Sequence, residues 1–551
     1  MLTKTRIALK YTLNFICLLQ TSLVVLIKMR FHMLLTQIIE RNAQIYGQQS
    51  ALNHNGKVQT WGQLRDRISR MASALSTQGV RSGDKVALLA LNSDHYIESF
   101  FAVLWLGGVI VPLNTRWSET ENKYAVDDAQ VSHLIVDATF AAIAKSLQAK
   151  CNSLVTVVGI GSIDFLDGQQ QSLFLEAVID AAESIVPVDV DDSVLAGVFY
   201  TGGTTGFPKG VMLSNINLWS SAVATVQGYN LNAQPVNFLH ALPLFHIAGV
   251  AGFLACSLIG AQQYFSPTFE PTKVIDVMEQ GDVSHVMLVP TMIAMLLTEQ
   301  GFNSQKLSSL KQIIYGASPI LESTLNTVMQ RLPEVEFYQG YGQTEVSPAI
   351  SILGPKEHNA LGREKLRSAG QACVCVQISI RSYNGTALAA GEVGEVAIKG
   401  PNVMMGYLNK AEETKEVLSD GWLLTGDIGY LDADGYLFLL DRAKDMIVTG
   451  AENVFSAEVE NVISTYPGVD SVAVIGIPSE EWGESVHAII VTQEDLEESD
   501  IIAHCRSQIA GYKCPKSIEF KKNLLPMSPA GKILKVELRK PYWQEETRSV
   551  G

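Results

Sequence analysis

The sequence predicts an α/β protein with two domains, a large N-terminal one built on mixed or parallel sheets and a smaller C-terminal α+β one. Three observations lead to this prediction. A chain of 551 residues is too long for a single hydrophobic core. Short apolar runs alternate with amphipathic stretches of helical period through most of the chain. Near residue 432 this alternation gives way to a hairpin and shorter strands.

The first 32 residues stand apart from that pattern. Basic residues flank an uncharged stretch at 11–27, which reaches only the short end of a membrane span. No small-residue cleavage site of the kind that follows a signal peptide comes after it. We interpret residues 1–32 as an extension ahead of a start at Met33, and a membrane anchor is the alternative.

The large domain, residues 33–440, begins with strand and helix signals at the spacing of βαβ units. Thr60 and Gln63 form a capping box ahead of a helix. Strand, helix and strand then follow at 84–91, 92–106 and 109–114, which predicts a largely parallel sheet. Similar strand signals recur at 131–137, 153–159, 283–290 and 310–316.

Residues 200–210, "YTGGTTGFPKG", hold four glycines, four hydroxyl side chains and one lysine. A buried strand is predicted at 193–200, directly before them, and a strand and helix at 209–226. The loop is not a Walker A motif, because Pro208 interrupts the pattern and glycine follows Lys209. Bare backbone N–H groups with hydroxyls and one cation can wrap a polyphosphate. The alternative is that these residues form an ordinary surface turn that binds no ligand.

The domain boundary is predicted at 441–445, with the small domain at 446–545. A hairpin at 429–441 precedes it, and two strands and a helix follow at 471–478, 485–491 and 498–512. The formal net charge of −15 argues against nucleic-acid binding. Seven scattered cysteines without a CxxC pair predict neither a disulfide framework nor a zinc site, and favour the cytoplasm. Peripheral membrane contact and homodimer formation are left open.

The loop at 200–210 resembles the signature loop of the adenylate-forming superfamily, and the likeness continues along residues 33–540. The other matching stretches are, in order, "LPLFHIAG" (242–249), "YGAS" (315–318), "GYGQTE" (340–345), "GWLLTGDIG" (421–429), "DRAKDMI" (441–447), "GAENVFSAEVE" (450–460) and "GK" (531–532). The fold implied by this resemblance is a large adenylate-forming domain with a small mobile C-terminal domain.

The resemblance also implies roles for individual residues. ATP would be bound by Thr201, Gly202, Gly203, Thr204, Thr205, Gly206, Lys209, Gly316, Ala317, Ser318, Tyr341, Gly342, Asp427 and Arg442. Catalysis would depend on Thr344, Glu345, His246 and Lys532. Thr201 and Glu345 would hold Mg²⁺ through hard oxygen ligands, and Lys532 would neutralise charge between the carboxylate and the α-phosphate.

Lys444 would be the pivot on which the small domain rotates between two reactions. After rotation, Gly450, Ala451 and Glu452 would line a tunnel for coenzyme A. In isolation several residues have plainer interpretations: His246 as a packed core histidine, Glu345 as a carboxylate at a helix start, and Lys532 as a solvated lysine.

The function expected from this resemblance is an AMP-forming acid–CoA ligase that uses ATP, Mg²⁺ and CoA. A medium- or long-chain fatty acid is the expected substrate, because the pocket stretches contain no prominent basic residue. An aryl-acid ligase and an enzyme that loads a carrier protein are alternatives. A catalytically silent, membrane-tethered nucleotide-binding protein is a third class, which Ala451 in place of the usual glycine would favour and an intact Lys532 and Glu345 oppose.

Overall fold

The computed structural model describes residues 32–160, 172–201, 208–233, 235–359, 363–449, 452–479, 481–527 and 533–543. The expected extension therefore lies outside the described residues up to position 31. Among the residues described, no helix is both long and apolar enough to span a bilayer. The six cysteines among the described residues are free thiols.

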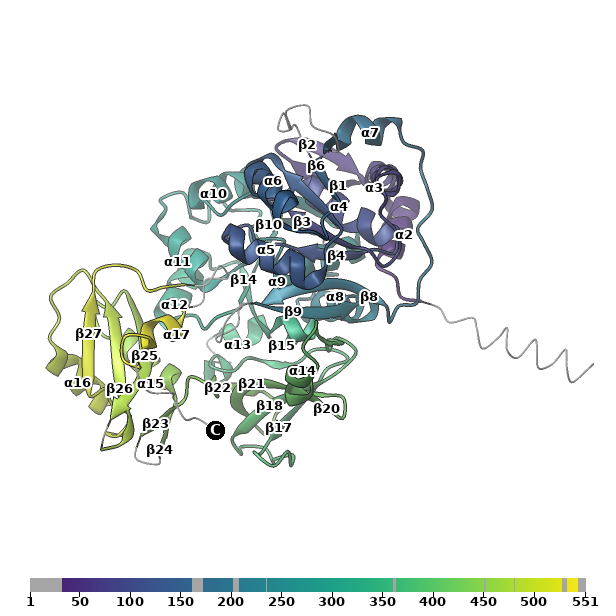
Figure 1. Cartoon of the computed structure of the whole chain (residues 1–551). Coiled ribbons are helices and arrows are strands. Elements are labelled where there is room, and N and C mark those ends of the chain that lie inside the picture. Colours follow the sequence, from purple (N-terminus) through teal and green to yellow (C-terminus); the bar gives the residue numbers. More distant parts are fainter. Residues whose placement is uncertain are drawn as a thin grey trace, which may run out of the picture.

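An eight-stranded sheet forms the first layer of the large domain (Figure 1). Its strands, in spatial order, are β19 (Gly406–Tyr407), β9 (Lys209–Ser214), β8 (Leu195–Thr201), β4 (Val109–Pro112), β3 (Lys85–Leu89), β5 (His133–Asp137), β6 (Thr156–Ile160) and β7 (Ser172–Phe174). The strands from β4 to β7 are parallel, whereas β8 and β9 form an antiparallel hairpin. The phosphate-loop residues close this hairpin.

A nine-stranded sheet forms the second layer. Its order is β16 (Gln371–Ala372), β15 (Ala349–Leu353), β14 (Glu336–Gly342), β13 (Gln312–Gly316), β12 (His285–Leu288), β10 (Asn237–His240), β11 (Gln262–Phe265), β1 (Ser50–His54) and β2 (Lys57–Thr60). The run from β14 to β1 is parallel, and both edges are antiparallel. Parallel strands need crossover helices, and these supply the core between the layers.

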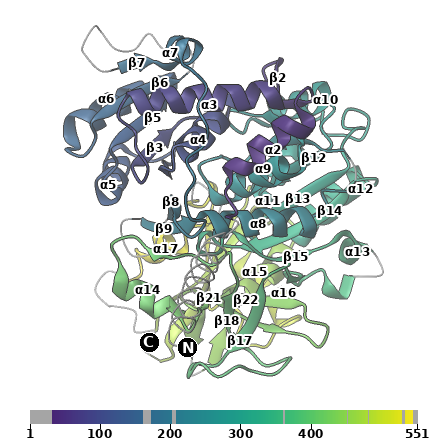
Figure 2. The same ribbon diagram turned by 90° about the vertical axis from the view of Figure 1, so that its right-hand side faces the viewer.

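The largest core is assembled from helices of both layers together with residues of several strands. Its main helices are α2 (Thr36–Tyr46), α3 (Trp61–Thr77), α4 (Asp94–Trp105), α8 (Asn215–Gly228) and α9 (Ile247–Ile259). Trp61 and Trp105 are fully buried there, and the rings of Phe100 and Phe253 meet edge-on with centroids 4.9 Å apart. Figure 2 shows α3 running across the top of this layered arrangement.

The remaining helices of the large domain lie on the outer faces or connect strands. They are α5 (Glu119–Ala129), η1 (Ala138–Phe140), α6 (Ala141–Lys150), α7 (Leu175–Ala181), α10 (Pro271–Gln280), α11 (Pro290–Thr298), α12 (Glu322–Arg331), η2 (Thr344–Val346), α13 (Pro355–His358), η3 (Arg363–Lys365) and α14 (Ala411–Val417). The predicted capping box is present, with the Gln63 amide donating to Thr60 Oγ1 over 3.3 Å.

A third sheet of five antiparallel strands, which the sequence pattern did not reveal, lies between the layers and the small domain. Its strands are β17 (Gln377–Arg381), β18 (Gly394–Lys399), β20 (Leu418–Ser419), β21 (Trp422–Leu431) and β22 (Leu437–Arg442). The predicted hairpin at 429–441 is the β21–β22 turn. Each of these strands alternates buried and exposed residues weakly, so period-two patterning gives little signal.

The last sheet begins after β22 and contains β23 (Ile447–Thr449), β24 (Glu452–Val454), β25 (Ser471–Ser479), β26 (Gly483–Val491) and β27 (Ser517–Lys521). Helices α15 (Ser456–Ser464), α16 (Glu498–Arg506) and α17 (Lys535–Arg539) accompany it. These elements form the yellow-green group at the left of Figure 1, with their own apolar clusters. Residues 441–445 therefore lie where the chain passes from the third sheet to the fourth.

Candidate active site

The predicted phosphate loop connects two strands whose ends are fixed by pairing. Thr201, the last residue of β8, lies opposite Lys209, the first residue of β9. Strand β8 is largely buried, so the loop is attached to a rigid base. The loop residues Gly202, Gly203, Thr204, Thr205 and Gly206 lie outside the described residues. Their contact with phosphate stays a prediction.

Lys209, the first residue of β9, is part of a charged cluster with the start of α14. Its ammonium pairs with Glu413, which also pairs with Lys410 over 3.2 Å. The same ammonium lies 5.1 Å from the ring centroid of Tyr407, a cation–π distance. Tyr407 reaches this place because β19 pairs antiparallel with β9, with Tyr407 opposite Val211.

Tyr407 also contacts the predicted metal ligand. Its hydroxyl donates a 2.8 Å hydrogen bond to Glu345 Oε1, and the Glu345 carbonyl accepts from the Met404 amide over 2.9 Å. Burial, followed by the nearby Glu345 charge, raises the pKa of Tyr407, so this hydroxyl stays protonated. Thr344 precedes Glu345 at the start of η2.

The donor set at this point fits a hard divalent cation. Glu345 is fixed through one carboxylate oxygen, which leaves the other oxygen able to accept a ligand bond. Mg²⁺ favours one or two protein oxygens together with substrate phosphates. Glu345, with Thr201 on the strand before the phosphate loop, would hold such an ion.

Three predicted nucleotide-binding residues form one connected group. The Tyr341 hydroxyl donates to Asp427 Oδ2 over 2.5 Å, and Arg442 Nε lies 3.2 Å from Asp427 Oδ1. Asp427 and Arg442 face each other across β21 and β22, whereas Tyr341 comes from β14 of another sheet. Asp427 is only 6% exposed. Its burial and two partners fix a carboxylate able to accept hydrogen bonds from ribose hydroxyls.

The electrostatics of this group favour neutral Tyr341 and charged Arg442. Burial and the Asp427 charge raise the pKa of Tyr341 well above its ordinary value. Burial works against the charge of Arg442, but Asp427 and then Asp445 raise the pKa of its guanidinium. Half of the Arg442 side chain surface remains exposed, so it can contact a ligand.

Glycines allow close backbone approach beside Tyr341. Gly316 pairs with Gly340, and a Cβ on Gly316 would lie 2.3 Å from the Gly340 carbonyl oxygen. A Cβ on Gly342 would lie 1.7 Å from the Pro348 carbonyl oxygen. Ala317 has a φ of +68°, the left-handed region, and turns the chain toward Ser318. The end of β13 is thus shaped by backbone, as expected for a surface that a base or acyl group approaches.

His246 is half-buried at the start of α9, with its ring centroid 4.4 Å from that of Phe245. The turn before it is tight, because Gly249 packs against the Pro243 carbonyl, 2.5 Å from where a Cβ would be. Both interpretations of this histidine, as a packed core residue and as a catalytic group, stay predictions.

The segment before and within the small domain is held by buried charges. Asp441 Oδ2 accepts from Ser456 Oγ over 2.7 Å, and Arg539 Nη1 pairs with Asp445 over 2.9 Å. Lys535, at the start of α17, pairs with Glu460 over 2.7 Å. These contacts attach α17 to the segment that contains Lys444.

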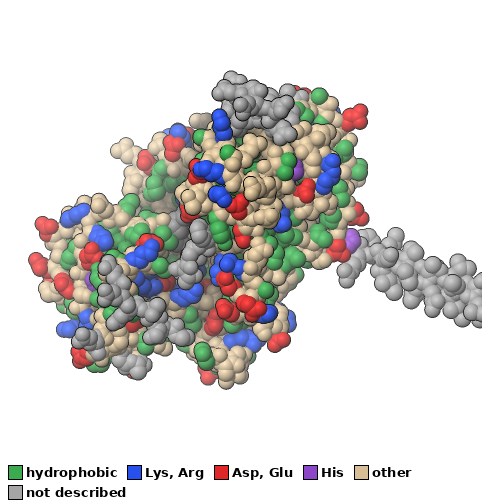
Figure 3. All heavy atoms as spheres, viewed as in Figure 1, with side chains coloured by type: hydrophobic (Ala, Val, Ile, Leu, Met, Phe, Trp, Pro, Cys, Tyr) green, Lys and Arg blue, Asp and Glu red, His purple; other side chains and the backbone are tan. Residues whose placement is uncertain are grey.

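Other predicted residues of the small domain are less fully placed. Glu452 is exposed on β24, whereas Gly450, Ala451 and Lys532 lie outside the described residues. Lys532 comes three positions before Lys535 along the chain. Figure 3 shows several Lys and Arg side chains on the face where the small domain meets the rest of the molecule. Rotation about Lys444 stays a prediction.

Two contributors to the site were missed in the sequence. The sequence predicted no functional role for the stretch that contains Tyr407 and Glu413. Only the pairing of β9 with β19 brings them to Lys209 and Glu345. A glycine–tyrosine pair after two methionines offers no chemical signal by itself.

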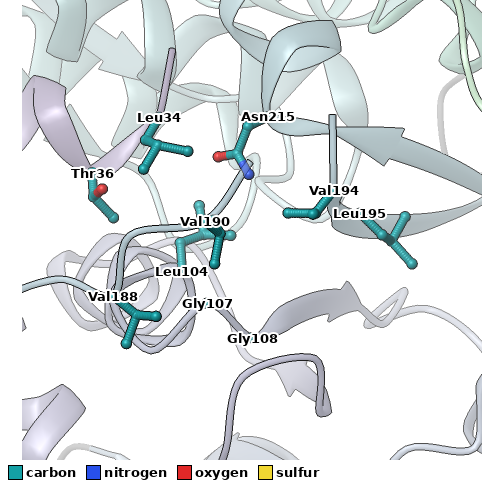
Figure 4. A pocket seen from close by; sticks show the side chains of 10 residues that line it. All are labelled: Leu34, Thr36, Leu104, Gly107, Gly108, Val188, Val190, Val194, Leu195 and Asn215. Atoms are coloured by element: carbon teal, nitrogen blue, oxygen red, sulfur yellow. The ribbon is translucent and has the colours of Figure 1, made fainter. Parts of the chain in front are cut away.

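A small cavity elsewhere in the molecule is not part of this site. It lies between the start of α2, the end of α4 and the first residue of α8, Asn215 (Figure 4). Its volume of about 10 Å³ has room for one water molecule. Asn215 Oδ1 accepts from the Leu35 amide over 3.4 Å, a contact that holds α2 against α8.

Comparison with known proteins identifies the family of this chain. Residues 39–408 match the AMP-binding enzyme family, and residues 458–532 match the AMP-binding enzyme C-terminal domain. The chain belongs to the AMP-binding enzyme family. Both the superfamily and the two-part α/β fold expected from the motifs are confirmed.

Relatives of this AMP-binding enzyme differ in the acid they are named for. A feruloyl-CoA synthase from Amycolatopsis sp. is 36% identical over 91% of this chain and 98% of its own. A medium/long-chain-fatty-acid–CoA ligase from Mycobacterium tuberculosis is 33% identical over 89% and 87%. The solved o-succinylbenzoate CoA synthetase from Bacillus subtilis, in complex with its acyl-adenylate, superposes with a TM-score of 0.79 at 29% identity, covering 93% of this chain and 98% of that one.

Proposed function

We propose that this AMP-binding enzyme is an AMP-forming acid–CoA ligase that acts in two steps. In the first, a carboxylate oxygen attacks the α-phosphorus of ATP, an acyl-AMP forms and pyrophosphate leaves. In the second, the CoA sulfur attacks the acyl carbon, the thioester forms and AMP leaves. The membership of the family and the acid–CoA ligases among its relatives support the proposal.

The observation that carries the proposal is the Tyr341–Asp427–Arg442 group. It joins two sheets at one end of β14, a few residues before Thr344 and Glu345 on the same chain segment. Asp427 and Arg442 would bind the ribose, and the aromatic face of Tyr341 would stack on adenine. The α-phosphate would then lie toward Thr344, with the β8–β9 loop around the pyrophosphate.

Charge neutralisation is the main catalytic requirement, because an anionic acid must approach an anionic triphosphate. Lys209 and Lys532 would supply positive charge from the protein, one at the base of the loop and one from the small domain. Mg²⁺ bound at Glu345 and Thr201 would neutralise phosphate charge. Tyr407 would keep the Glu345 carboxylate in position.

The acid class is the finer part of the proposal. The fatty acid expected from the sequence stays a prediction, and the aryl alternative stands beside it because both kinds of ligase occur among the relatives. Loading of a carrier protein in place of CoA also stays an alternative. Thioester yield with CoA, compared with yield on a purified carrier protein, distinguishes these two acceptors.

Replacing Lys532 tests the two-step mechanism. Lys532→Ala is expected to lower acid-dependent pyrophosphate release about 10²- to 10³-fold, while supplied acyl-AMP is still converted to acyl-CoA. Lys444→Pro is expected to do the reverse, because proline restricts the backbone at the proposed pivot. Lys540→Ala is the matched control, since Lys540 is exposed and pairs with Glu537, three positions earlier in the chain. Equal loss of both half-reactions in both variants would refute the rotation.

A further inference from the structure

Strand β21 does not run evenly beside β18 on its way to Asp427. Glu395 of β18 lies opposite Ile428 of β21. Ala397, two positions further along β18, lies opposite Leu424, which is four positions away from Ile428 on β21. Strand β21 therefore contains two extra residues here, which form a bulge that ends at Asp427. Bulges bend a strand and re-aim its side chains, and they are frequent next to active sites.

Gly426 lies within this bulge and gives it its backbone conformation. Its φ is +73°, in the left-handed region that glycine adopts without strain. Apart from its chain neighbours, no described residue places an atom within 4 Å of a Cβ built on Gly426, so backbone conformation and not crowding requires the glycine. Its carbonyl accepts a hydrogen bond from the Ala443 amide over 2.9 Å. The bulge is thus attached to the residue that follows Arg442.

Two side chains hold the bulge against β18. Glu395 Oε1 accepts a hydrogen bond from the Gly426 amide over 3.0 Å. The Thr425 hydroxyl donates to the Val396 carbonyl over 2.8 Å, and its oxygen accepts from the Asp427 amide over 3.1 Å. Because the bulge interrupts the ladder, these two consecutive amides have side chains as partners in place of a neighbouring strand. The backbone on both sides of the Gly426–Asp427 peptide is thereby fixed.

The direction of the Asp427 side chain depends on this bulge. Both partners of its carboxylate come from outside β21, Tyr341 from β14 and Arg442 from β22. Flattening the bulge would displace this part of β21 along β18 by two residues, which is roughly 7 Å. Hydrogen bonds weaken steeply once distance and angle leave their narrow range. Even a small part of that displacement would therefore misalign the Asp427 carboxylate.

The position of Glu395 is electrostatically unfavourable, which makes its hydrogen bond informative. Glu395 is half-buried on β18, beside the carboxylate of Asp427. Burial raises the pKa of Glu395, the hydrogen bond from the Gly426 amide opposes that rise, and the Asp427 charge adds to it. A second carboxylate near Asp427 is thus disfavoured by burial and by repulsion. The contact that offsets both is the one that holds the bulge.

We propose that Glu395 is a positioning residue of the nucleotide site, which holds the bulge at Gly426 so that Asp427 is directed at the ribose hydroxyls. Glu395 acts through Asp427 and thereby sets the preference for a ribonucleotide over a nucleotide that lacks these hydroxyls. Thr425 supports the same bulge from its other end. This inference rests on the nucleotide-binding role of Asp427 in the proposed function and adds a determinant of nucleotide specificity to it.

The test compares the binding of ATP and dideoxy-ATP, which lacks both ribose hydroxyls, to the full-length protein. Dissociation constants are measured by isothermal titration calorimetry with Mg²⁺ present. The wild type is expected to bind ATP about 10- to 100-fold more tightly, the effect of hydrogen bonds to a charged group. Glu395→Ala is expected to weaken ATP binding about 10-fold and to leave dideoxy-ATP within about 2-fold, because only ATP depends on the direction of Asp427.

Three further variants show whether Glu395 acts through the bulge and Asp427. Glu395→Gln keeps an oxygen that can accept from the Gly426 amide, so the ratio of the two dissociation constants is expected to stay within about 2-fold of the wild type. Thr425→Val removes the hydroxyl and is expected to lower the ratio about 3-fold. Adding Glu395→Ala to Asp427→Ala is expected to change the ratio no further, because the group through which Glu395 acts is gone.

Glu392→Ala is the matched control. Glu392 is also a glutamate that accepts a backbone hydrogen bond, from the Ala389 amide over 2.7 Å, but it is exposed in the turn before β18. Its ratio is expected to equal that of the wild type. Thermal melting of each variant reports whether the fold is retained. The ratio of two dissociation constants within one variant is independent of the fraction folded.

The outcomes separate this inference from the proposed function. Equal weakening of ATP and dideoxy-ATP in Glu395→Ala would mean that Glu395 supports only the fold, and it would overturn the inference. Equal binding of the two nucleotides by the wild type, or the same fall in ratio with Glu392→Ala, would overturn it too. Acid-dependent pyrophosphate release is measured on the same proteins. Its absence, with the expected ratios intact, would overturn the ligase and leave the role of Glu395.

Discussion

The two faces of β14 contact different parts of the molecule. On one face the Tyr341 hydroxyl is already bound to Asp427, which is in turn paired with Arg442. On the other face the Tyr229 hydroxyl fills the place of a side chain at position 340, 2.0 Å from where a Cβ on Gly340 would be. One face thus carries a hydrogen-bonded ion pair, whereas the other is covered by an aromatic side chain.

The face that carries Tyr341 and contacts Asp427, called the nucleotide face below, is expected to bind ATP. ATP is the expected nucleotide for every member of the family. An Asp427 carboxylate that is already paired before ATP binds would therefore help ATP binding with any acid. The relatives are named for different acids, so the residues that would contact the acid are expected to differ in what they select. Changes on the nucleotide face should therefore affect all acids equally, and changes to the residues that would contact the acid should discriminate among them.

The largest effect of the three changes considered next is expected on the nucleotide face. Asp427→Ala removes a buried carboxylate and leaves Tyr341 and Arg442 without it. We expect kcat/KM for ATP to fall about 100-fold, as for loss of a charged hydrogen-bonding group, by the same factor with every acid. Pyrophosphate release at varied ATP measures it. Asp434→Ala, at an exposed position on the following turn, is the control. Different factors for different acids would contradict the separation of the two faces.

An intermediate effect concerns a buried histidine of the nine-stranded sheet. His240, at the end of β10, donates to or accepts from Gln263 over 2.9 Å, and its ring stacks on Phe265. Burial lowers its pKa to about 4, from an ordinary value of 6.5. The unfolded chain therefore binds a proton that the folded chain refuses, and the free energy of unfolding falls as pH drops from 6.5 toward 4.

Between pH 7.5 and 5, the titration of His240 is expected to lower the free energy of unfolding by about 2 kcal/mol. Urea denaturation at the two pH values measures it, in the wild type and in His240→Gln. Glutamine at position 240 does not titrate in this range. On acidification, the free energy of unfolding of the variant should therefore fall less than that of the wild type, and the difference should equal that amount. The same pH dependence in both proteins would show that another group is responsible.

The smallest effect is expected at Tyr407, whose hydroxyl donates a hydrogen bond to the predicted metal ligand Glu345. Tyr407→Phe removes the hydrogen bond to Glu345 and keeps the ring under Lys209. Because water can replace the hydroxyl, we expect about a 5-fold rise in the Mg²⁺ concentration that gives half-maximal rate. Tyr430→Phe is the control, because the Tyr430 ring stacks on Phe438 within the β21–β22 hairpin. An unchanged Mg²⁺ requirement would show that Glu345 is positioned without Tyr407.

Much of the fold could be predicted from local pattern. The strands from β3 to β6 and helix α4 agree with the predicted segments within a few residues, because their apolar runs and caps are short-range signals. The third sheet was missed, since strands with mixed exposure carry little period-two signal. The motifs singled out residues of β14, β21 and β22, and the structure brings Tyr341, Asp427 and Arg442 together, while their binding of a nucleotide stays a prediction.

The sequence by itself determined the family and the alternation of strands and helices, because motifs and hydrophobic periods are local patterns along the chain. The tertiary structure alone decided that Tyr407 meets Glu345 and that Tyr229 ends beneath Gly340. Those pairs are 62 and 111 residues apart along the chain. Strand pairing and helix packing bring such distant segments together, and neither leaves a signature near the residues concerned.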